Sequence, residues 1–321
     1  MRPEPAATLV EPALVPARRR SPLRARVARA APPYLLLLPA IAVIGAVLGY
    51  PLYKLVTLSF QRYGLFELLR HRGTWIGADN YTHILRDPQF WHVLWRTVVF
   101  TAVNVGLTML LATLVALLLA KLGPVMRVAL SAGLVLVWAM PPVVSVNIWN
   151  WMVDYEFGVL NWTLTKLGVG NFLHHDWFDN PVSGLAVVTA IVVWGAIPFV
   201  AITLYAGLTQ VPRDLVEAAE IDGANALKVF RDITFPILKP VFVICASLSV
   251  IWDFQVFSQI WILRNTRPES GYWLMSVYSF VTSFSVSQYG LGSAIAVLMV
   301  LVMLGVTFVY IRQMVRIGEL Q

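Results

Sequence analysis

Long apolar runs dominate the chain, and shorter polar segments separate them. A transmembrane helix needs about 20 mostly apolar residues. Six runs meet or approach this length, at residues 34–59, 93–120, 128–153, 182–208, 237–263 and 291–311. The pattern predicts an all-α integral membrane protein with about six transmembrane helices, and residues 34–321 form its transmembrane domain.

The composition supports a membrane location. Hydrophobic residues make up 58% of the chain, charged residues make up only 13%, and the mean hydropathy is +0.72. Soluble domains carry about 25% charged residues, because their surfaces face water. We therefore predict a multi-pass protein of the plasma or inner membrane, surrounded by the lipid bilayer. The single cysteine, Cys245, lies inside an apolar run and excludes an intrachain disulfide.

Residues 1–33 are rich in proline, alanine and arginine and show no apolar periodicity. This composition predicts a disordered, basic cytoplasmic tail. A cleaved signal peptide is the alternative, but the apolar run that follows is longer than a signal core. The net charge of +7 raises the question of nucleic acid. Arginines crowd directly before the first apolar run, where the positive-inside rule places a cytoplasmic flank, so no nucleic-acid partner is expected.

The basic residues also predict an orientation. If the N-terminus faces the cytoplasm, the cytoplasmic segments hold more than half of the 24 lysines and arginines. Six spans then place both termini in the cytoplasm. Residues 272–286 are aromatic and apolar, and a re-entrant or interfacial helix is the alternative there.

The polar segment 209–240 reads TQVPRDLVEAAEIDGANALKVFRDITFPILKP. Pro212 suits a first helical position, and Glu217 lies in the early turns, where the helix dipole favours acidic groups. Gly223 can adopt a left-handed conformation and end this helix. A second short helix is expected over 224–233, separate from the span that begins near residue 237. On this pattern alone, a connector resting on the bilayer surface explains the segment about equally well.

A family resemblance favours a more specific interpretation. Glu217-Ala218-Ala219, Gly223, Ile233 and Pro236 are spaced as in the EAA loop of binding-protein-dependent ABC importer permeases, which this segment resembles. Asp222-Gly223-Ala224 and Phe230 are similar to the carbohydrate branch of the maltose and glycerol-3-phosphate type. The resemblance implies an ABC type I importer permease fold, in which this loop docks on a separate ATPase subunit. The coupling residues it implies are Glu217, Ala218, Ala219, Asp222, Gly223, Ala224 and Phe230.

The resemblance extends over most of residues 34–315. Residues 77–101 resemble the segment before the second span of these permeases, and residues 253–263 (DFQVFSQIWIL) resemble their fifth span. The family then continues with a glycine-rich loop, whereas this chain has Arg264-Asn265-Thr266-Arg267-Pro268.

The resemblance implies a function and an assembly. The chain is expected to be the permease subunit of an ATP-driven importer that moves a sugar or sugar-like solute into the cytoplasm. Its expected partners are a second related permease, two ATPase subunits and an extracytoplasmic solute-binding protein. ATP and magnesium belong to the ATPase partners, because the chain has no G-x-x-x-x-G-K-[ST] phosphate loop. We expect no cofactor, no metal and no catalytic residue in this chain, although His174 and His175 beside Asp176 leave a metal site as an alternative.

Polar side chains inside the spans are candidates for a solute path, since such residues tend to face a cavity or a partner helix. Asn147, Asn150 and Asp154 are spaced to share a helical face, and so are Trp252, Gln255 and Gln259, with Asp253 beside them. Amides and aromatic rings suit a carbohydrate, but hydrogen bonding between helices is an equally open explanation. The candidate path residues are Trp252, Asp253, Gln255, Gln259, Asn147 and Asn150.

Two other classes of protein remain as alternatives. A transporter driven by an ion gradient needs ionisable residues within its spans, and this chain has few, chiefly Lys54 and Asp253. A membrane enzyme needs a catalytic constellation, and neither an H-E-x-x-H nor a G-x-S-x-G motif is present.

Overall fold

The computed structural model describes residues 36–318, with side chains up to residue 314. The predicted cytoplasmic tail, residues 1–33, lies outside the described residues. The chain divides into two compact units, Met1–Lys54 and Leu55–Gln321. Five helices in the described part are long and apolar enough to cross a membrane, or six if one bent pair counts as a single span.

The first apolar run forms one helical stretch, Leu36–Ser59, as predicted. It contains a π-helical turn, η1 (Gly45–Gly49), and ends in α2 (Tyr50–Ser59). A small layer follows the first span. It consists of strands β1 (Gln61–Arg62) and β2 (Thr74–Trp75), which pair antiparallel, with α3 (Leu65–Arg70) between them and α4 (Asp79–Arg86) after them.

Spans two and four are confirmed as single long helices. They form α5 (Pro88–Lys121) and α9 (Pro181–Leu208). Both helices begin with proline, whose missing N–H costs no bond in the first turn. Each also has a side-chain cap: Asp87 accepts from the Gln89 N–H at 2.9 Å and Asn180 from the Val182 N–H at 2.8 Å.

The third span is not the continuous helix that the apolar run predicts. Helix α6 (Pro124–Trp138) and helix α7 (Pro142–Met152) meet at an angle of 99°. Pro141 and Pro142 stand at the break. Neither has an N–H to donate, and each restricts the residue before it to extended conformations. The helix therefore stops near Ala139 and restarts in a new direction.

The fifth span begins earlier than predicted and contains a break. One helical run covers Ala226–Leu263. It joins α11 (Ala226–Val229), the π-turn η2 (Phe230–Thr234) and α12 (Phe235–Phe254), and it resumes after residues 255–257 as α13 (Ser258–Leu263). Residues 226–233 are helical, as expected, but the expected separation of this helix from the span is wrong. A π-turn bonds each N–H to a carbonyl five residues back, and this wider turn carries the helix past Pro236.

The last part of the chain contains the segment 272–286, followed by span six. Residues 272–286, for which a re-entrant or interfacial helix was the alternative, are largely helical: they cover the end of η3 (Ser270–Tyr272), then α14 (Met275–Phe280) and the π-turn η4 (Val281–Ser285). Leu274, Met275 and Val277 are buried there. Helix α15 (Tyr289–Gly318) then forms the last span.

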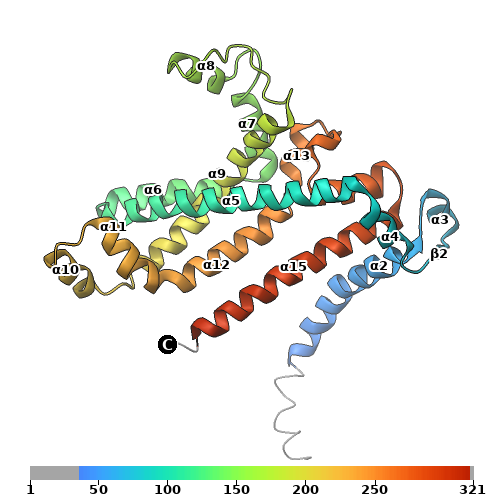
Figure 1. Cartoon of the computed structure of the whole chain (residues 1–321), viewed down its shortest axis with the longest axis horizontal. Coiled ribbons are helices and arrows are strands. Elements are labelled where there is room, and N and C mark those ends of the chain that lie inside the picture. Colours follow the sequence, from blue (N-terminus) through green and yellow to red (C-terminus); the bar gives the residue numbers. More distant parts are fainter. Residues whose placement is uncertain (1–35, 319–321) are drawn as a thin grey trace, which may run out of the picture. The chain divides into compact units, whose positions relative to one another are not determined.

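Small residues let the central helices approach closely. Ala112, Ala116, Ala201 and Cys245 are fully buried where α5, α9 and α12 meet. Membrane helices pack in this way because lipid offers no hydrophobic driving force between them. The three helices α5, α9 and α12 all contact one another, and Figure 1 shows α9 crossing α5.

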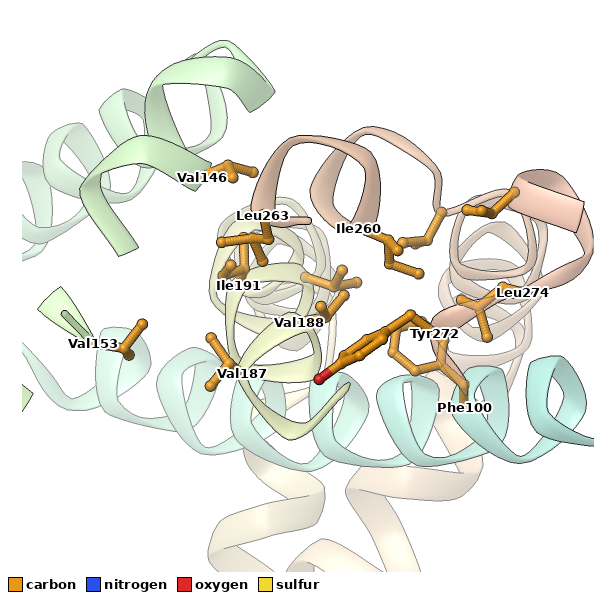
Figure 2. Packing of buried hydrophobic residues seen from close by; sticks show 13 residues of the cluster. Phe100, Val146, Val153, Val187, Val188, Ile191, Ile260, Leu263, Tyr272 and Leu274 are labelled. Carbon is orange, nitrogen blue, oxygen red and sulfur yellow. The ribbon is translucent and has the colours of Figure 1, made fainter. Parts of the chain in front are cut away.

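A second cluster ties the broken elements together. Phe100, Val146, Ile191, Ile260 and Tyr272 lie in it, and they come from α5, α7, α9, α13 and η3 (Figure 2). The Tyr272 hydroxyl donates to the carbonyl oxygen of Phe178 at 2.7 Å. This cluster fixes the short helices α7 and α13, which carry the breaks of spans three and five.

Candidate functional site

The bend predicted at Gly223 is present. Helix α10 (Arg213–Ile221) ends at Asp222, and Gly223 has a left-handed φ of +79°. The Ala224 N–H returns to the Ala219 carbonyl oxygen at 2.9 Å and closes the turn. The next helix starts directly, because Asn225 accepts from the Lys228 N–H at 2.9 Å.

The bend lies at one end of the long helices (Figure 1). Four predicted coupling residues are exposed: Glu217, Ala218, Asp222 and Gly223. Ala219, Ala224 and Phe230 are half-buried.

Two large apolar side chains beside this bend are missing from the predicted coupling set. Ile221 is 86% exposed and Leu227 is 74% exposed. Ile221 gives only a weak signal in the sequence, because it stands alone between Glu220 and Asp222. Together with Leu215, these two side chains form an exposed apolar set around the bend, which we call the apolar rim.

Aromatic contacts anchor the bend to the membrane helices. The rings of Phe230 and Phe235 lie 6.2 Å apart, and those of Phe235 and Phe242 lie 5.1 Å apart. Gly207 of α9 packs so closely that a Cβ there would approach Leu238 of α12 to 2.8 Å. These contacts join the bend to α12 and, through Leu238, to α9.

Arg127 connects two further spans at the same end. Its guanidinium donates to the carbonyl oxygens of Leu119 at 3.0 Å and Leu122 at 2.6 Å, which caps the end of α5. It also lies over the ring of Tyr205 on α9, 5.4 Å from the centroid. Sequence reasoning did not identify these partners, because they lie on different spans.

A cavity of about 220 Å³ lies where the two broken spans face α9. The break of span three supplies Trp138 and Ser145, and α9 supplies Trp194. The break of span five supplies Trp252, Asp253 and Gln259. Non-helical backbone is tolerated at membrane depth only where protein buries it or where it lines a cavity. The two breaks therefore mark this cavity as the candidate solute site.

The structure brings together only part of the predicted path. Trp252, Asp253 and Gln259 line the cavity, whereas Gln255 does not. The Gln255 amide donates to the Ile251 carbonyl oxygen at 3.1 Å. The predicted common face fails because the helix breaks at residues 255–257, so helical spacing no longer relates Gln255 to Gln259.

The asparagines of span three also lie outside the cavity wall. Asn147 and Asn150 are exposed on α7, and the Asn147 amide donates to the Val143 carbonyl oxygen at 2.8 Å. Asp154 follows the end of α7 and accepts from the Glu156 N–H at 2.9 Å. Asn147 and Asn150 are three residues apart on α7, as predicted, but Asp154 lies beyond the end of this helix and stabilises a turn.

The histidine pair is built into a loop. The His175 ring packs on Phe172 and Trp177, with centroids 5.5 Å and 4.9 Å away, and His174 packs on Tyr155 at 5.3 Å. Among residues 36–318, no group of three or more histidine, cysteine or acidic side chains is placed to hold a metal ion.

These features define a class of protein: a multi-pass membrane transport subunit with a polar coupling bend at one end and a cavity between broken helices. Comparison with known proteins gives the family. The chain belongs to the family described as binding-protein-dependent transport system inner membrane component, whose model matches residues 109–316. It is accordingly a permease component of ABC importers, a transport subunit and not an enzyme.

Relatives and solved structures agree with this assignment. The chain is 44% identical over 280 residues to the diacetylchitobiose uptake system permease protein DasB of Streptomyces coelicolor, covering 87% of this chain and 85% of that protein. It is 32% identical over 286 residues to the trehalose/maltose transport system permease protein MalF of Thermococcus litoralis, covering 87% and 92%.

Among solved structures, it resembles a bacterial ABC transporter involved in the import of the acidic polysaccharide alginate. The TM-score is 0.73 at 18% identity, over 92% of this chain and 99% of that one, which shows a shared fold.

Proposed function

We propose that this permease subunit carries a sugar or sugar-like solute into the cytoplasm. It works with a second related permease, two ATPase subunits and an extracytoplasmic solute-binding protein. The names of its relatives, which handle diacetylchitobiose, trehalose and maltose, support the solute class. The cavity supports it independently, because aromatic faces, an amide and a carboxylate together suit a polyhydroxylated ring.

The coupling bend is the proposed ATPase contact. The apolar rim around Gly223, in a segment that is otherwise polar, is the main support for this role. Exposed apolar side chains within a polar surface are typical of a protein contact. Glu217 offers a charge partner, and Phe230 transmits movement to α12. ATP and magnesium are bound by the ATPase subunits, and this chain binds no cofactor.

The two parts are coupled through one helical run. Ala226–Leu263 joins the bend to the break that carries Asp253. ATP binding in the partners stabilises one arrangement of the bend over another, and a ligand shifts a conformational equilibrium only through such a difference. The direction of membrane insertion, with both termini in the cytoplasm, is part of this proposal.

Reconstitution tests the proposal. The four-subunit assembly is placed in proteoliposomes with its solute-binding protein, and ATP hydrolysis is measured with diacetylchitobiose, trehalose or maltose as probes. We expect at least one of these sugars to stimulate hydrolysis and to accumulate inside in an ATP-dependent manner. Uptake that an ion uncoupler abolishes and that ATP depletion leaves unchanged would instead establish a transporter driven by an ion gradient.

A further inference from the structure

Asp253 is a carboxylate with an unused acceptor in the wall of the cavity. The residue is only 3% exposed, and its Oδ2 atom is buried with no hydrogen-bond partner within residues 36–318. Buried carboxylates are normally paired or hydrogen-bonded, because an isolated buried charge is costly. Asp253 lines the cavity, so a ligand there can supply a donor to this carboxylate once the side chain turns its unpaired oxygen outward.

The rest of the cavity wall favours the same kind of ligand. Within the described residues, the wall contains no lysine, arginine or histidine. Three indole rings, from Trp138, Trp194 and Trp252, contribute instead. Aromatic faces carry negative charge density, which attracts cations and donor groups and repels anions.

The N-terminus of α7 does not reverse this preference. Helix N-termini bind anions through free N–H groups, and this one lies at the cavity wall. However, Pro142 has no N–H, and the N–H groups of Val144 and Ser145 both bond the Pro141 carbonyl oxygen, at 2.9 Å and 3.2 Å. The helix end therefore has few donors left for an anion.

We propose that Asp253 makes the solute path a charge filter. It accepts hydrogen bonds from neutral or amine-bearing saccharides and rejects saccharides that carry carboxylates. This inference rests on the proposed sugar-import function. It separates this chain from the alginate importer with which it shares its fold, because alginate is an acidic polysaccharide.

Equilibrium binding to the purified assembly, without the solute-binding protein, tests the filter directly. Leaving out the binding protein removes its own selectivity from the measurement. Three probes of equal length are compared: diacetylchitobiose, which is neutral, chitobiose, which carries two amines, and digalacturonate, which carries two carboxylates. Like charges placed together cost several kcal/mol. We therefore expect digalacturonate to bind on the order of 100-fold more weakly than diacetylchitobiose.

Variants assign the effect to Asp253. Asp253→Asn keeps the size and one acceptor but removes the charge, so we expect the gap between the anionic and neutral probes to shrink to within about tenfold. Asp253→Glu keeps the charge and keeps the gap. Ser145→Ala changes a neutral polar group of the same wall, and we expect it to shift all three probes alike.

The outcomes separate this inference from the proposed function. If the wild type binds digalacturonate as well as diacetylchitobiose, or if Asp253→Asn leaves the gap unchanged, the charge filter is wrong and the sugar path stands. If the wild type binds none of the three saccharides, the sugar path itself is wrong and the filter falls with it. The comparison of probes on the wild type is decisive even if the Asp253→Asn assembly does not form.

Discussion

Gly223 shows how a single residue sets the shape of the coupling bend. Its φ of +79° lies in the left-handed region, which residues with a Cβ enter at a cost of about 1–2 kcal/mol. A Cβ at this position would meet no atom within 4 Å, so volume is not the constraint. The backbone conformation alone explains the need for glycine here.

We therefore predict that Gly223→Val uncouples the importer. Valine is β-branched and resists the left-handed region, so the turn opens and the apolar rim moves out of place. Solute-stimulated ATP hydrolysis in the reconstituted assembly should fall at least about fivefold, since 1–2 kcal/mol changes an equilibrium by about 5–30-fold. Membrane insertion should be unchanged. Gly223→Asn is the matched control, because asparagine tolerates this conformation, and a fully active Gly223→Val variant would refute the docking role.

A second left-handed turn lies in the loop after α13. Asn265 and Thr266 have φ values of 50° and 62°. The Thr266 N–H bonds the Trp261 carbonyl oxygen at 2.8 Å, and Arg264 pairs with Glu269 at 2.6 Å to close the loop. The Arg264 guanidinium, which donates to this carboxylate, lowers the pKa of Glu269. The loop thus keeps a conformation typical of glycine without containing one.

This predicts a stabilising substitution, Thr266→Gly. Glycine relieves about 1–2 kcal/mol of left-handed strain and costs roughly 0.5–1 kcal/mol of unfolded-state entropy. The net gain should be up to about 1 kcal/mol, read as a higher midpoint of thermal unfolding in detergent. Thr266→Ala removes the branch but not the strain and serves as the control. A lower midpoint for Thr266→Gly than for Thr266→Ala would contradict this account.

Contacts between helices determine whether other glycines can be replaced by larger residues. Gly184 of α9 faces the Tyr272 ring so closely that a Cβ would lie 2.5 Å from Cε1. Tyr272 cannot move aside easily, because its hydroxyl is bonded to Phe178 and the Arg264 guanidinium lies 4.7 Å from its ring centroid. Gly106 of α5, by contrast, has no atom within 4 Å of an added Cβ.

Alanine at these two positions should therefore act in opposite directions. Gly184→Ala overpacks the interface between α9 and η3, and we expect a loss of about 1–3 kcal/mol. Gly106→Ala restricts the unfolded chain without a clash, and we expect no loss or a gain of up to about 1 kcal/mol. Denaturant unfolding of both variants in the same detergent provides the measurement. Equal effects at the two positions would show that packing on Tyr272 does not constrain α9.

The spans could be predicted from the sequence because length and apolarity are local properties. The breaks of spans three and five could not be predicted in this way. Pro198 lies inside the intact helix α9, whereas Pro141 and Pro142 stand where span three turns by 99°. A proline in an apolar run permits either outcome, and the neighbouring helices decide between them. The break at residues 255–257 contains no proline or glycine, so the sequence does not predict it.

The two functional regions also differ in how far the sequence predicts them, because one depends on neighbouring residues and the other on contacts between distant spans. The bend itself was predictable because Pro212 at a helix start and Gly223 at its end are local signals, whereas the continuation of the next helix into span five was not. The cavity was predictable only in part. Trp252, Asp253 and Gln259 are close in sequence, but Trp138 and Trp194 reach the same wall from other spans. Their convergence depends on the two breaks.

At the scale of the whole molecule, the exposed apolar surface has two explanations: contact with lipid and contact with partner subunits. The apolar rim can be assigned, because it surrounds a polar bend and not an apolar span. Ile221, at 86% exposure, is its most accessible member. Cys245 is fully buried, so the native chain offers little background to a thiol reagent.

Ile221→Cys therefore tests orientation and docking together. A membrane-impermeant maleimide should label it in inverted vesicles and not in intact cells, because the bend is predicted to be cytoplasmic. Bound ATPase subunits should lower the rate of labelling at least about tenfold, since contact residues at a packed protein interface are shielded from solvent.

Val169→Cys, in the loop after α8 (Val159–Lys166) and 64% exposed, is the matched control. It should react from the opposite side at a rate that the ATPase subunits do not change. Labelling of Ile221→Cys in intact cells would reverse the topology, whereas equal labelling with and without the ATPase subunits would move the contact away from the bend.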